Sequence, residues 1–358
     1  MNILYLSKLK GQLWAGPTYS VPNQILAQSK YDNVLWYNLT NNSKNDWKKF
    51  TYYKDLDDFP ACNLKDLPSP FNKPDLVVFE QIYSFGINIS IINEIRRSKI
   101  PYIIIPRSEL TQAAQQRKKM KKSIANLFYF NKVINEAKAI QYLTEKEMID
   151  SGKRWNNNFF IIPNGCQEYN NINYKSRMVR HVIYVGRIET YQKGLDLLID
   201  ACENIKEILR RKKVVIDIYG PDRDNSRKNL ELKINKANIS DIIKINEEIF
   251  SEEKIAKLNN ADAFVMTSRF EGLPMGMIEA LSLGLPCLAT KGTNLADKIQ
   301  EYDAGWVAEN NVLSISKALI ASLEDNDILN KSKNAHTLSK TYSWKAIGEL
   351  SHKYYEKI

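Results

Sequence analysis

Two glutamates eight residues apart enclose a glycine-containing segment in the second half of the chain. Glu271 opens this segment and Glu279 closes it, with Gly272 and Gly276 between them. An apolar strand is expected at 262–266, just before the segment, and a helical pattern follows it. A diphosphate can lie against the free backbone N–H groups of such a helix start, where the helix dipole favours negative charge. The spacing therefore predicts a diphosphate site flanked by two carboxylates, with a plain strand–turn–helix carrying surface glutamates as the alternative.

Two cations follow an earlier strand at a similar place. Gly186-Arg187 comes after the expected strand 181–185, and Lys193-Gly194 opens a helical pattern over 193–211. Arginine offers a planar fork of donors and lysine a compact charge, a pair suited to neutralising a diphosphate leaving group. Solvated surface cations are the alternative for this segment.

Taken together, these segments resemble the donor-site motifs of the family 4 (group 1) glycosyltransferases. The residues that carry the resemblance are Gly186-Arg187, Lys193-Gly194 and the run Glu271-Gly-Leu-Pro-Met-Gly-Met-Ile-Glu279. The resemblance implies an α/β protein of GT-B architecture, with two Rossmann-like doubly wound domains facing a cleft. It also implies sugar transfer with retained anomeric configuration, no catalytic metal, and a nucleotide diphosphate sugar as donor substrate in place of a resident cofactor.

The resemblance assigns a role to each motif residue. Arg187 and Lys193 are expected to contact the donor diphosphate and Glu271 the transferred sugar, so these three are the catalytic candidates. Glu279 is expected to accept hydrogen bonds from the ribose hydroxyls. The full set of expected donor-binding residues is Gly16, Gly186, Arg187, Lys193, Glu271, Gly272, Leu273, Pro274, Met275, Gly276 and Glu279.

The first half of the chain matches the family less specifically. Gly16 lies in a loop that the resemblance places over the donor phosphates and acceptor, although an ordinary strand-to-helix turn is the alternative. Many relatives have a histidine after the strand that ends here at Ile105, but this chain has Arg107. The resemblance therefore gives no histidine a catalytic role.

Short Val/Ile-rich runs alternate with longer amphipathic stretches along the whole chain, which is typical of βα units. Strands are expected at 2–6, 33–37, 75–79, 101–105, 139–142, 159–162, 181–185, 214–219, 241–245, 262–266 and 286–289. Helical patterns are expected at 85–97, 112–137, 193–211, 251–258 and 312–325. A polar, turn-rich stretch near 163–180 marks the domain boundary. We expect an acceptor-side domain over 1–170, a donor-binding domain over 175–340, and a last helix, 342–358, that packs back on the first domain.

The composition and charge of the chain indicate its class of protein, its compartment and the charge of its partner. The chain has 358 residues, 44% hydrophobic and 26% charged, and four cysteines without a CxxC pair. Ordinary globular composition argues against disorder, and the N-terminus lacks the pattern of a signal peptide, so we expect a cytoplasmic protein with reduced thiols. Residues 1–175 carry 24 Lys/Arg against 15 Asp/Glu, a net of +9 out of +10 for the chain. This asymmetry predicts an anionic partner for the first half.

A basic run next to apolar and aromatic residues gives that partner a candidate surface. The cations are Arg117, Lys118, Lys119, Lys121 and Lys122, followed by the apolar and aromatic residues of 124–130. The pattern predicts peripheral attachment to an anionic membrane, for instance at the inner face of the cell membrane, with a solvated helix face as the alternative. Nucleic-acid binding is not indicated, because spread stacking aromatics and known binding modules are missing.

The sequence as a whole therefore predicts a retaining glycosyltransferase. It would move a sugar from a nucleotide diphosphate sugar to a saccharide or lipid-linked acceptor in cell-surface polysaccharide or glycolipid assembly. The alternatives are a GT-B nucleotide-sugar epimerase and a non-catalytic partner subunit of the same fold.

Overall fold

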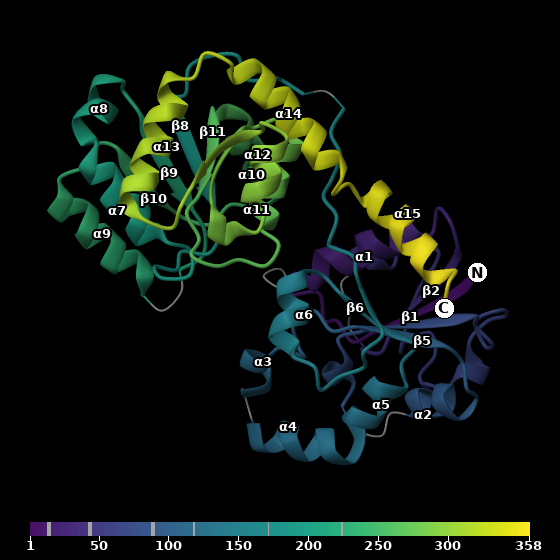
Figure 1. Cartoon of the computed structure of the whole chain (residues 1–358). Helices are drawn as coiled ribbons and strands as arrows, with labels where there is room; N and C mark the ends of the chain where they lie inside the picture. The colour runs from purple at the N-terminus through teal and green to yellow at the C-terminus, as the bar shows by residue number, and fades with distance from the viewer. Residues whose placement is uncertain (13–15, 42–44, 87–89, 117–118, 171, 223–224) are drawn as a thin grey trace. The chain divides into compact units, whose positions relative to one another are not determined.

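The chain folds into two α/β units, each built around its own parallel sheet (Figure 1). The computed structural model describes residues 1–12, 16–41, 45–86, 90–116, 119–170, 172–222 and 225–358. The first unit comprises Met1–Gly165 together with Trp344–Ile358, and the second comprises Cys166–Ser343. The second unit is thus inserted in the sequence of the first.

Seven parallel strands form the sheet of the first unit, in the order β3-β2-β1-β4-β5-β6-β7. Their bounds are Asn2–Ser7 (β1), Asn33–Asn38 (β2), Tyr53–Asp55 (β3), Leu76–Glu80 (β4), Tyr102–Ile105 (β5), Ala139–Tyr142 (β6) and Phe159–Ile161 (β7). Alternate residues of one strand enter different cores: Leu4 and Leu6 belong to one apolar cluster, and Ile3 and Tyr5 to another. Both faces of the sheet are therefore buried, as expected for apolar parallel strands.

The helices of the first unit come from both ends of the chain. They are Pro17–Gln28 (α1), Ser90–Arg97 (α2), Gln112–Gln116 (α3), Lys119–Ala125 (α4), Asn131–Glu136 (α5), Glu145–Ser151 (α6) and Trp344–Tyr355 (α15). A π-helical turn, Asn126–Phe130 (η4), joins α4 to α5, and 3₁₀ turns lie at Asn45–Trp47, Leu64–Asp66 and Ile82–Phe85. The last helix, α15, packs on α1, where a side chain at Gly348 would lie 2.8 Å from the Ala27 carbonyl oxygen (Figure 1).

Six parallel strands form the sheet of the second unit, in the order β10-β9-β8-β11-β12-β13. Their bounds are His181–Val185 (β8), Val215–Tyr219 (β9), Ile243–Asn246 (β10), Ala263–Met266 (β11), Cys287–Thr290 (β12) and Gly305–Ala308 (β13). The helices are Leu195–Asn204 (α7), Lys206–Arg211 (α8), Ser226–Ala237 (α9), Ser251–Asn260 (α10), Met275–Ser282 (α11), Ala296–Glu301 (α12), Val312–Glu324 (α13) and Ile328–Lys340 (α14), with a 3₁₀ turn at Lys291–Thr293. Both units have a Rossmann-like doubly wound sheet, which confirms the predicted fold class.

The helical pattern expected over 112–137 is confirmed in the described residues: α3 covers 112–116, and α4, η4 and α5 follow one another without interruption over 119–136. Other elements were missed. Two short strands at sheet edges, β3 and β13, and the polar helices α9 and α14 were not predicted. The sequence pattern does not reveal the two strands, because three or four residues are too few to show alternation. It does not reveal the two helices, because they have few apolar positions.

Candidate active site

The candidate site lies at the carboxyl ends of the two central strands of the second unit, β8 and β11. The strand order reverses there, because the chain runs outward to β9 and β10 on one side and to β12 and β13 on the other. Ligands of open α/β sheets bind outside the strand ends at such a switch point. Gly186 and Arg187 directly follow β8, and the segment 267–274 connects β11 to α11.

Two glycines let the loops of this site approach the strand ends. Gly194 has a positive φ of 62°, and a Cβ on it would lie 2.0 Å from the carbonyl oxygen of Thr267. Gly276 lies in the first turn of α11, where a Cβ would come within 2.6 Å of the Val185 carbonyl oxygen. The Thr267 hydroxyl also donates to the Gly194 carbonyl oxygen at 2.8 Å. The chain around Lys193 and the start of α11 are therefore held directly against the ends of β11 and β8.

Lys193 and Glu271 form an ion pair with each other. Their side chains are only 8% and 11% exposed, so the pair is largely withdrawn from water. The Ser268 hydroxyl lies 3.5 Å from the same Glu271 oxygen, and the Asn294 amide donates to the Glu271 carbonyl oxygen at 2.6 Å. The structure thus brings together two residues that were predicted separately as a diphosphate ligand and a sugar ligand.

Arg187 is a cation of the site that no carboxylate of the described residues pairs with. Its guanidinium makes no hydrogen bond or ion pair with any residue in the described part of the chain, and the side chain is half-buried. Its carbonyl oxygen accepts a hydrogen bond of 2.9 Å from the Tyr184 hydroxyl. Burial raises the pKa of that hydroxyl, Glu271 raises it further and Arg187 lowers it. The charges of Arg187 and Glu271 therefore act on the same buried group.

Backbone N–H groups at the start of α11 add further donors. Among the described residues, no acceptor pairs with the N–H groups of Gly272, Leu273, Met275 or Gly276. The first N–H groups to be bonded are those of Met277 and Ile278, both to the Pro274 carbonyl oxygen, at 2.9 and 3.1 Å. Helix α11 begins at Met275, as predicted. Its first turn offers the unpaired donors and the dipole that an anion requires.

Glu279 lies one turn into α11 and pairs with a residue that sequence reasoning missed. The ammonium of Lys254, on α10, is 2.8 Å from a Glu279 carboxylate oxygen, and both side chains are about one-third exposed. No short-range sequence signal connects these residues, because they lie on different helices. A ligand hydroxyl that binds Glu279 would share the carboxylate with this lysine.

A second missed feature braces the loops. Arg269 donates to both carboxylate oxygens of Asp196 at 2.7 Å, and to the Tyr191 carbonyl oxygen at 2.8 Å. Its guanidinium also lies 4.7 Å from the centre of the Tyr191 ring. Bidentate arginine–carboxylate contacts are geometrically specific. Arg269 thus joins the loop after β11 to the helix that follows Lys193.

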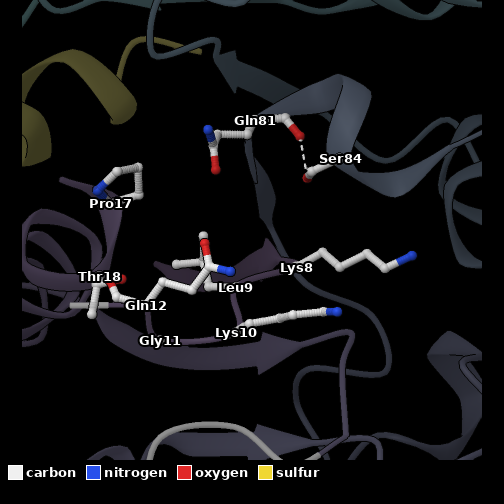
Figure 2. A pocket seen from close by; sticks show the side chains of 9 residues that line it. All are labelled: Lys8, Leu9, Lys10, Gly11, Gln12, Pro17, Thr18, Gln81 and Ser84. Atoms are coloured by element: carbon white, nitrogen blue, oxygen red, sulfur yellow. Dashed lines mark hydrogen bonds between the residues drawn. The ribbon is translucent and has the colours of Figure 1, made fainter. Parts of the chain in front are cut away.

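In the first unit, a pocket of about 400 Å³ lies at the corresponding switch point, between β1 and β4. Its polar lining includes Lys8 and Lys10 after β1, Thr18 of α1, and Gln81 after β4. Figure 2 shows the two lysines extending in the same direction, with Gln81 across the pocket. Gly16 immediately precedes α1, and its carbonyl oxygen accepts from Ser20 N–H at 3.0 Å. The predicted loop thus borders this pocket.

Arg107 occupies the strand end where relatives often have histidine, and the first unit satisfies it completely. Its guanidinium donates to Glu80 at 2.6 and 3.3 Å, to Ser20 at 2.9 Å, to Gln24 at 2.8 Å and to Asn164 at 3.0 Å. The Arg107 side chain is 4% exposed and that of Glu80 is fully buried. All five donors are used, so Arg107 joins β4, α1 and the end of the unit and has none left for a ligand.

The described residues contain no group of three or more His, Cys, Asp or Glu side chains arranged to hold a metal ion. Within the same part of the chain, no helix has both the length and the apolar character needed to cross a bilayer.

Residues 167–340 match the family model of the glycosyl transferases, group 1. An uncharacterized glycosyltransferase of Methanocaldococcus jannaschii is 27% identical over 245 residues, which is 67% of this chain and 65% of that protein. A putative colanic acid biosynthesis glycosyltransferase of Escherichia coli K12 is 28% identical over 147 residues, 39% of this chain and 35% of the relative. An E. coli galactosyltransferase named for a GlcNAc-diphosphoundecaprenol substrate is 35% identical over 79 residues, 22% of this chain and 20% of its own.

The chain spans less than two thirds of the length of these curated relatives. Among solved structures, an Anabaena protein crystallised with UDP aligns over the full length of both chains, with a TM-score of 0.71 and 13% identity. At this identity the likeness concerns the fold. These matches support the group 1 superfamily of GT-B glycosyltransferases, and they do not favour the epimerase or the non-catalytic subunit.

Proposed function

We propose, from the match of residues 167–340 to the group 1 family model, that the chain is a retaining, metal-independent glycosyltransferase. It would transfer a sugar from a nucleotide diphosphate sugar to an acceptor in cell-surface polysaccharide or glycolipid assembly. The observation that carries the proposal is a set of donors at the switch point of the second sheet: the Arg187 guanidinium and the N–H groups at the start of α11 have no partner among the described residues. This is an arrangement for an anion of two charges or more.

The proposed chemistry breaks the bond between the anomeric carbon and the donor diphosphate and forms a bond from that carbon to an acceptor oxygen. The proton of the acceptor hydroxyl passes to the departing diphosphate. Charge grows on the departing diphosphate in the transition state. Arg187 and the N–H groups of Gly272, Leu273, Met275 and Gly276 would stabilise that charge from fixed positions, without reorganisation. The Lys193 ammonium would contact the diphosphate as well as Glu271. Its weaker hold on Glu271 would leave that carboxylate able to accept hydrogen bonds from the sugar hydroxyls. Glu279 would accept from the ribose.

The acceptor is proposed to carry a negative charge. Lys8 and Lys10 are exposed, form no ion pair within the described residues, and line the pocket at the switch point of the first sheet. One relative is named for a diphosphoundecaprenol-linked sugar. A lipid-linked diphosphate acceptor would present a compact anion one sugar away from the accepting hydroxyl, and two lysines suit such a group. Such an acceptor would place the chain in the cytoplasm at the inner face of a membrane.

Ligand binding gives the first test. Thermal unfolding of the full chain should be measured with UDP, GDP and ADP, and with their common sugar conjugates. UDP is the first choice, because the Anabaena structural neighbour was crystallised with it. A ligand that binds only the folded state at 100 times its Kd stabilises that state by about 2.7 kcal/mol, so the melting temperature should rise for the matching nucleotide. No shift with any nucleoside diphosphate would contradict the proposed donor site.

Transfer itself needs a second assay. Labelled sugar from the donor that gives the largest shift should enter the lipid fraction of bacterial membranes in the presence of the chain. The Arg187→Ala variant is the control, since it should fold normally and transfer poorly. Release of free sugar without lipid labelling in both proteins would contradict the lipid-linked acceptor.

A further inference from the structure

An apolar stripe faces solvent on the helical segment 119–136 of the first unit. Met120, Ile124, Leu127 and Phe128 are 80%, 58%, 71% and 79% exposed. Their spacing of four, three and one residues puts them on one side of α4 and η4. Figure 1 shows α4 at the periphery of its unit. Large apolar side chains exposed together on one helix face are unusual for a surface that meets only water.

The opposite side of the same segment is anchored in the unit, so the stripe cannot rotate inward. Tyr129 and Phe130 are buried in the core. The Tyr83 hydroxyl donates to the Asn126 side chain at 2.6 Å, and the Asn126 amide donates to the Gln115 side chain at 3.0 Å. Polar bonds and core contacts together fix which face of the segment looks outward.

The cations of the segment divide between the two sides. Lys119 and Lys121 are exposed and form no ion pair with any described residue. Lys122 turns inward instead, donating to the Ala114 carbonyl oxygen at 2.8 Å with its ammonium 4.8 Å from the centre of the Tyr83 ring. Arg117 and Lys118 of the predicted basic run lie outside the described residues. The sequence has no Asp or Glu between Glu109 and Glu136, so nothing acidic offsets the lysines locally.

We propose that this face docks on the surface of a bilayer that contains anionic lipid. The docking face consists of Met120, Ile124, Leu127 and Phe128 with Lys119 and Lys121. The apolar side chains would enter the boundary between headgroups and acyl chains, and the ammonium groups would contact lipid phosphates. Charge complementarity favours lipid over a protein partner, because one short helical face combines apolar projections with cations of one sign. The inference rests on exposure and charge, and it requires neither donor nor acceptor binding.

Vesicle co-sedimentation of the full chain tests the proposal without any sugar substrate. The vesicles are phosphatidylcholine alone, and phosphatidylcholine with phosphatidylglycerol at 3:1, each across a salt series. Two variants divide the face: Leu127→Ser with Phe128→Ser removes apolar contact, and Lys119→Gln with Lys121→Gln removes charge. We expect binding that needs phosphatidylglycerol and falls with salt. The apolar variant should bind at least tenfold more weakly, and the charge variant about fivefold more weakly for each lysine.

Helix α9 of the second unit supplies a matched control. Leu232 is 60% exposed, with exposed lysines at 228 and 236, one turn before and after it. Leu232→Ser with Lys228→Gln and Lys236→Gln makes the same kinds of change away from the docking face, and should alter vesicle binding less than twofold. All variants should keep the wild-type melting temperature within a few degrees, since the changed side chains are exposed.

Three outcomes would overturn the inference. The first is no binding of wild type to the anionic vesicles at low salt, and the second is an equal loss in the α9 variant. The third is a wild-type dimer that the apolar variant dissociates while vesicle binding is absent, which would make the face a contact between copies of the chain. Nucleotide-induced stabilisation would survive each of these, so failure of the docking face and failure of the proposed activity can be distinguished.

Discussion

The two sheets of this chain use arginines at the ends of their strands in opposite ways. At the end of β5 in the first unit, Arg107 donates all its hydrogen bonds to its own unit, and its main partner is the buried Glu80. After the end of β8 in the second unit, the Arg187 guanidinium has no hydrogen-bond or ion-pair partner among the described residues. The first arginine holds elements together, whereas the second is available to a ligand. An arginine after the carboxyl end of a strand therefore stabilises the fold in the first unit and is available for binding in the second.

Loss of Arg107 should give the largest change. Arg107→Met leaves the Glu80 carboxylate buried without its cation, which costs about 3–5 kcal/mol of the free energy of unfolding. Thermal unfolding should show a drop in melting temperature on the order of 10 °C. The double variant Arg107→Met with Glu80→Leu removes both charges and should recover most of the loss. A double variant no more stable than the single one would contradict a buried ion pair as the cause.

Loss of Arg187 should have the opposite effect: the transfer rate should fall while the stability of the fold changes little. Arg187→Ala should reduce the transfer rate ~10²–10³-fold, the scale expected for one preorganised transition-state donor. The melting temperature should change little, because the guanidinium has no partner to lose within the described residues. Arg180 is an exposed arginine before the opposite end of β8, so Arg180→Ala is the matched control and should leave the rate unchanged. Equal rates for wild type and Arg187→Ala would remove Arg187 from the reaction.

The two glutamates of the site should fail differently in calorimetry. Glu279→Gln should weaken binding of a bare nucleoside diphosphate about tenfold, because it removes a charged acceptor for the ribose. Glu271→Gln should leave bare nucleotide binding unchanged or tighter, because Lys193 is then released toward the diphosphate. The same variant should weaken binding of the nucleotide sugar. If both variants lose bare nucleotide binding equally, the division of roles between the carboxylates is wrong.

A smaller effect concerns pH and the first unit. Burial raises the pKa of Glu109 from 4.5 to about 7, against the opposing effects of a hydrogen bond from Tyr83 N–H and the charge of Lys122. The folded state therefore holds a proton that the unfolded chain releases, so this group lowers stability as pH rises from about 4.5 to 7, with no further loss above that range. Glu109→Gln keeps the acceptor for Tyr83 and should gain melting temperature over wild type across that window. A difference that does not vary with pH would contradict the raised pKa.

The sequence predicted the second unit better than the first, for a physical reason. Arg187, Lys193 and the start of α11 lie within single βα connections, where spacing along the chain determines spacing in the fold. The pairing of Lys193 with Glu271, 78 residues apart, could not be foreseen, because it depends on how two loops meet. The same holds for Lys254 with Glu279.

In the first unit, the role of Arg107 depends on four partner residues that lie in three separate parts of the sequence. A glutamate that ends a buried apolar strand was the available signal, since Glu80 is paired in register with Ile105 of β5, two residues before Arg107. The sequence pattern also did not show which face of the segment 119–128 points to solvent. Apolar residues occur on both sides of that segment, and only its tertiary contacts show that Phe130 is internal and Phe128 external.

The insertion of the second unit within the first has a consequence for folding during synthesis. Residues 1–165 leave the ribosome long before α15, whose Ile347 and Tyr355 complete one apolar core of the first unit and whose Tyr355 hydroxyl bonds Gln141 at 2.7 Å. Until α15 has been synthesised, part of α1 is therefore uncovered and one core of the first unit is incomplete. The second unit has no such dependence and can fold while the first is still open. Chain order and folding order are thus expected to be reversed, and a released chain that ends at Ser343 should have a protease-resistant second unit and a protease-sensitive first unit.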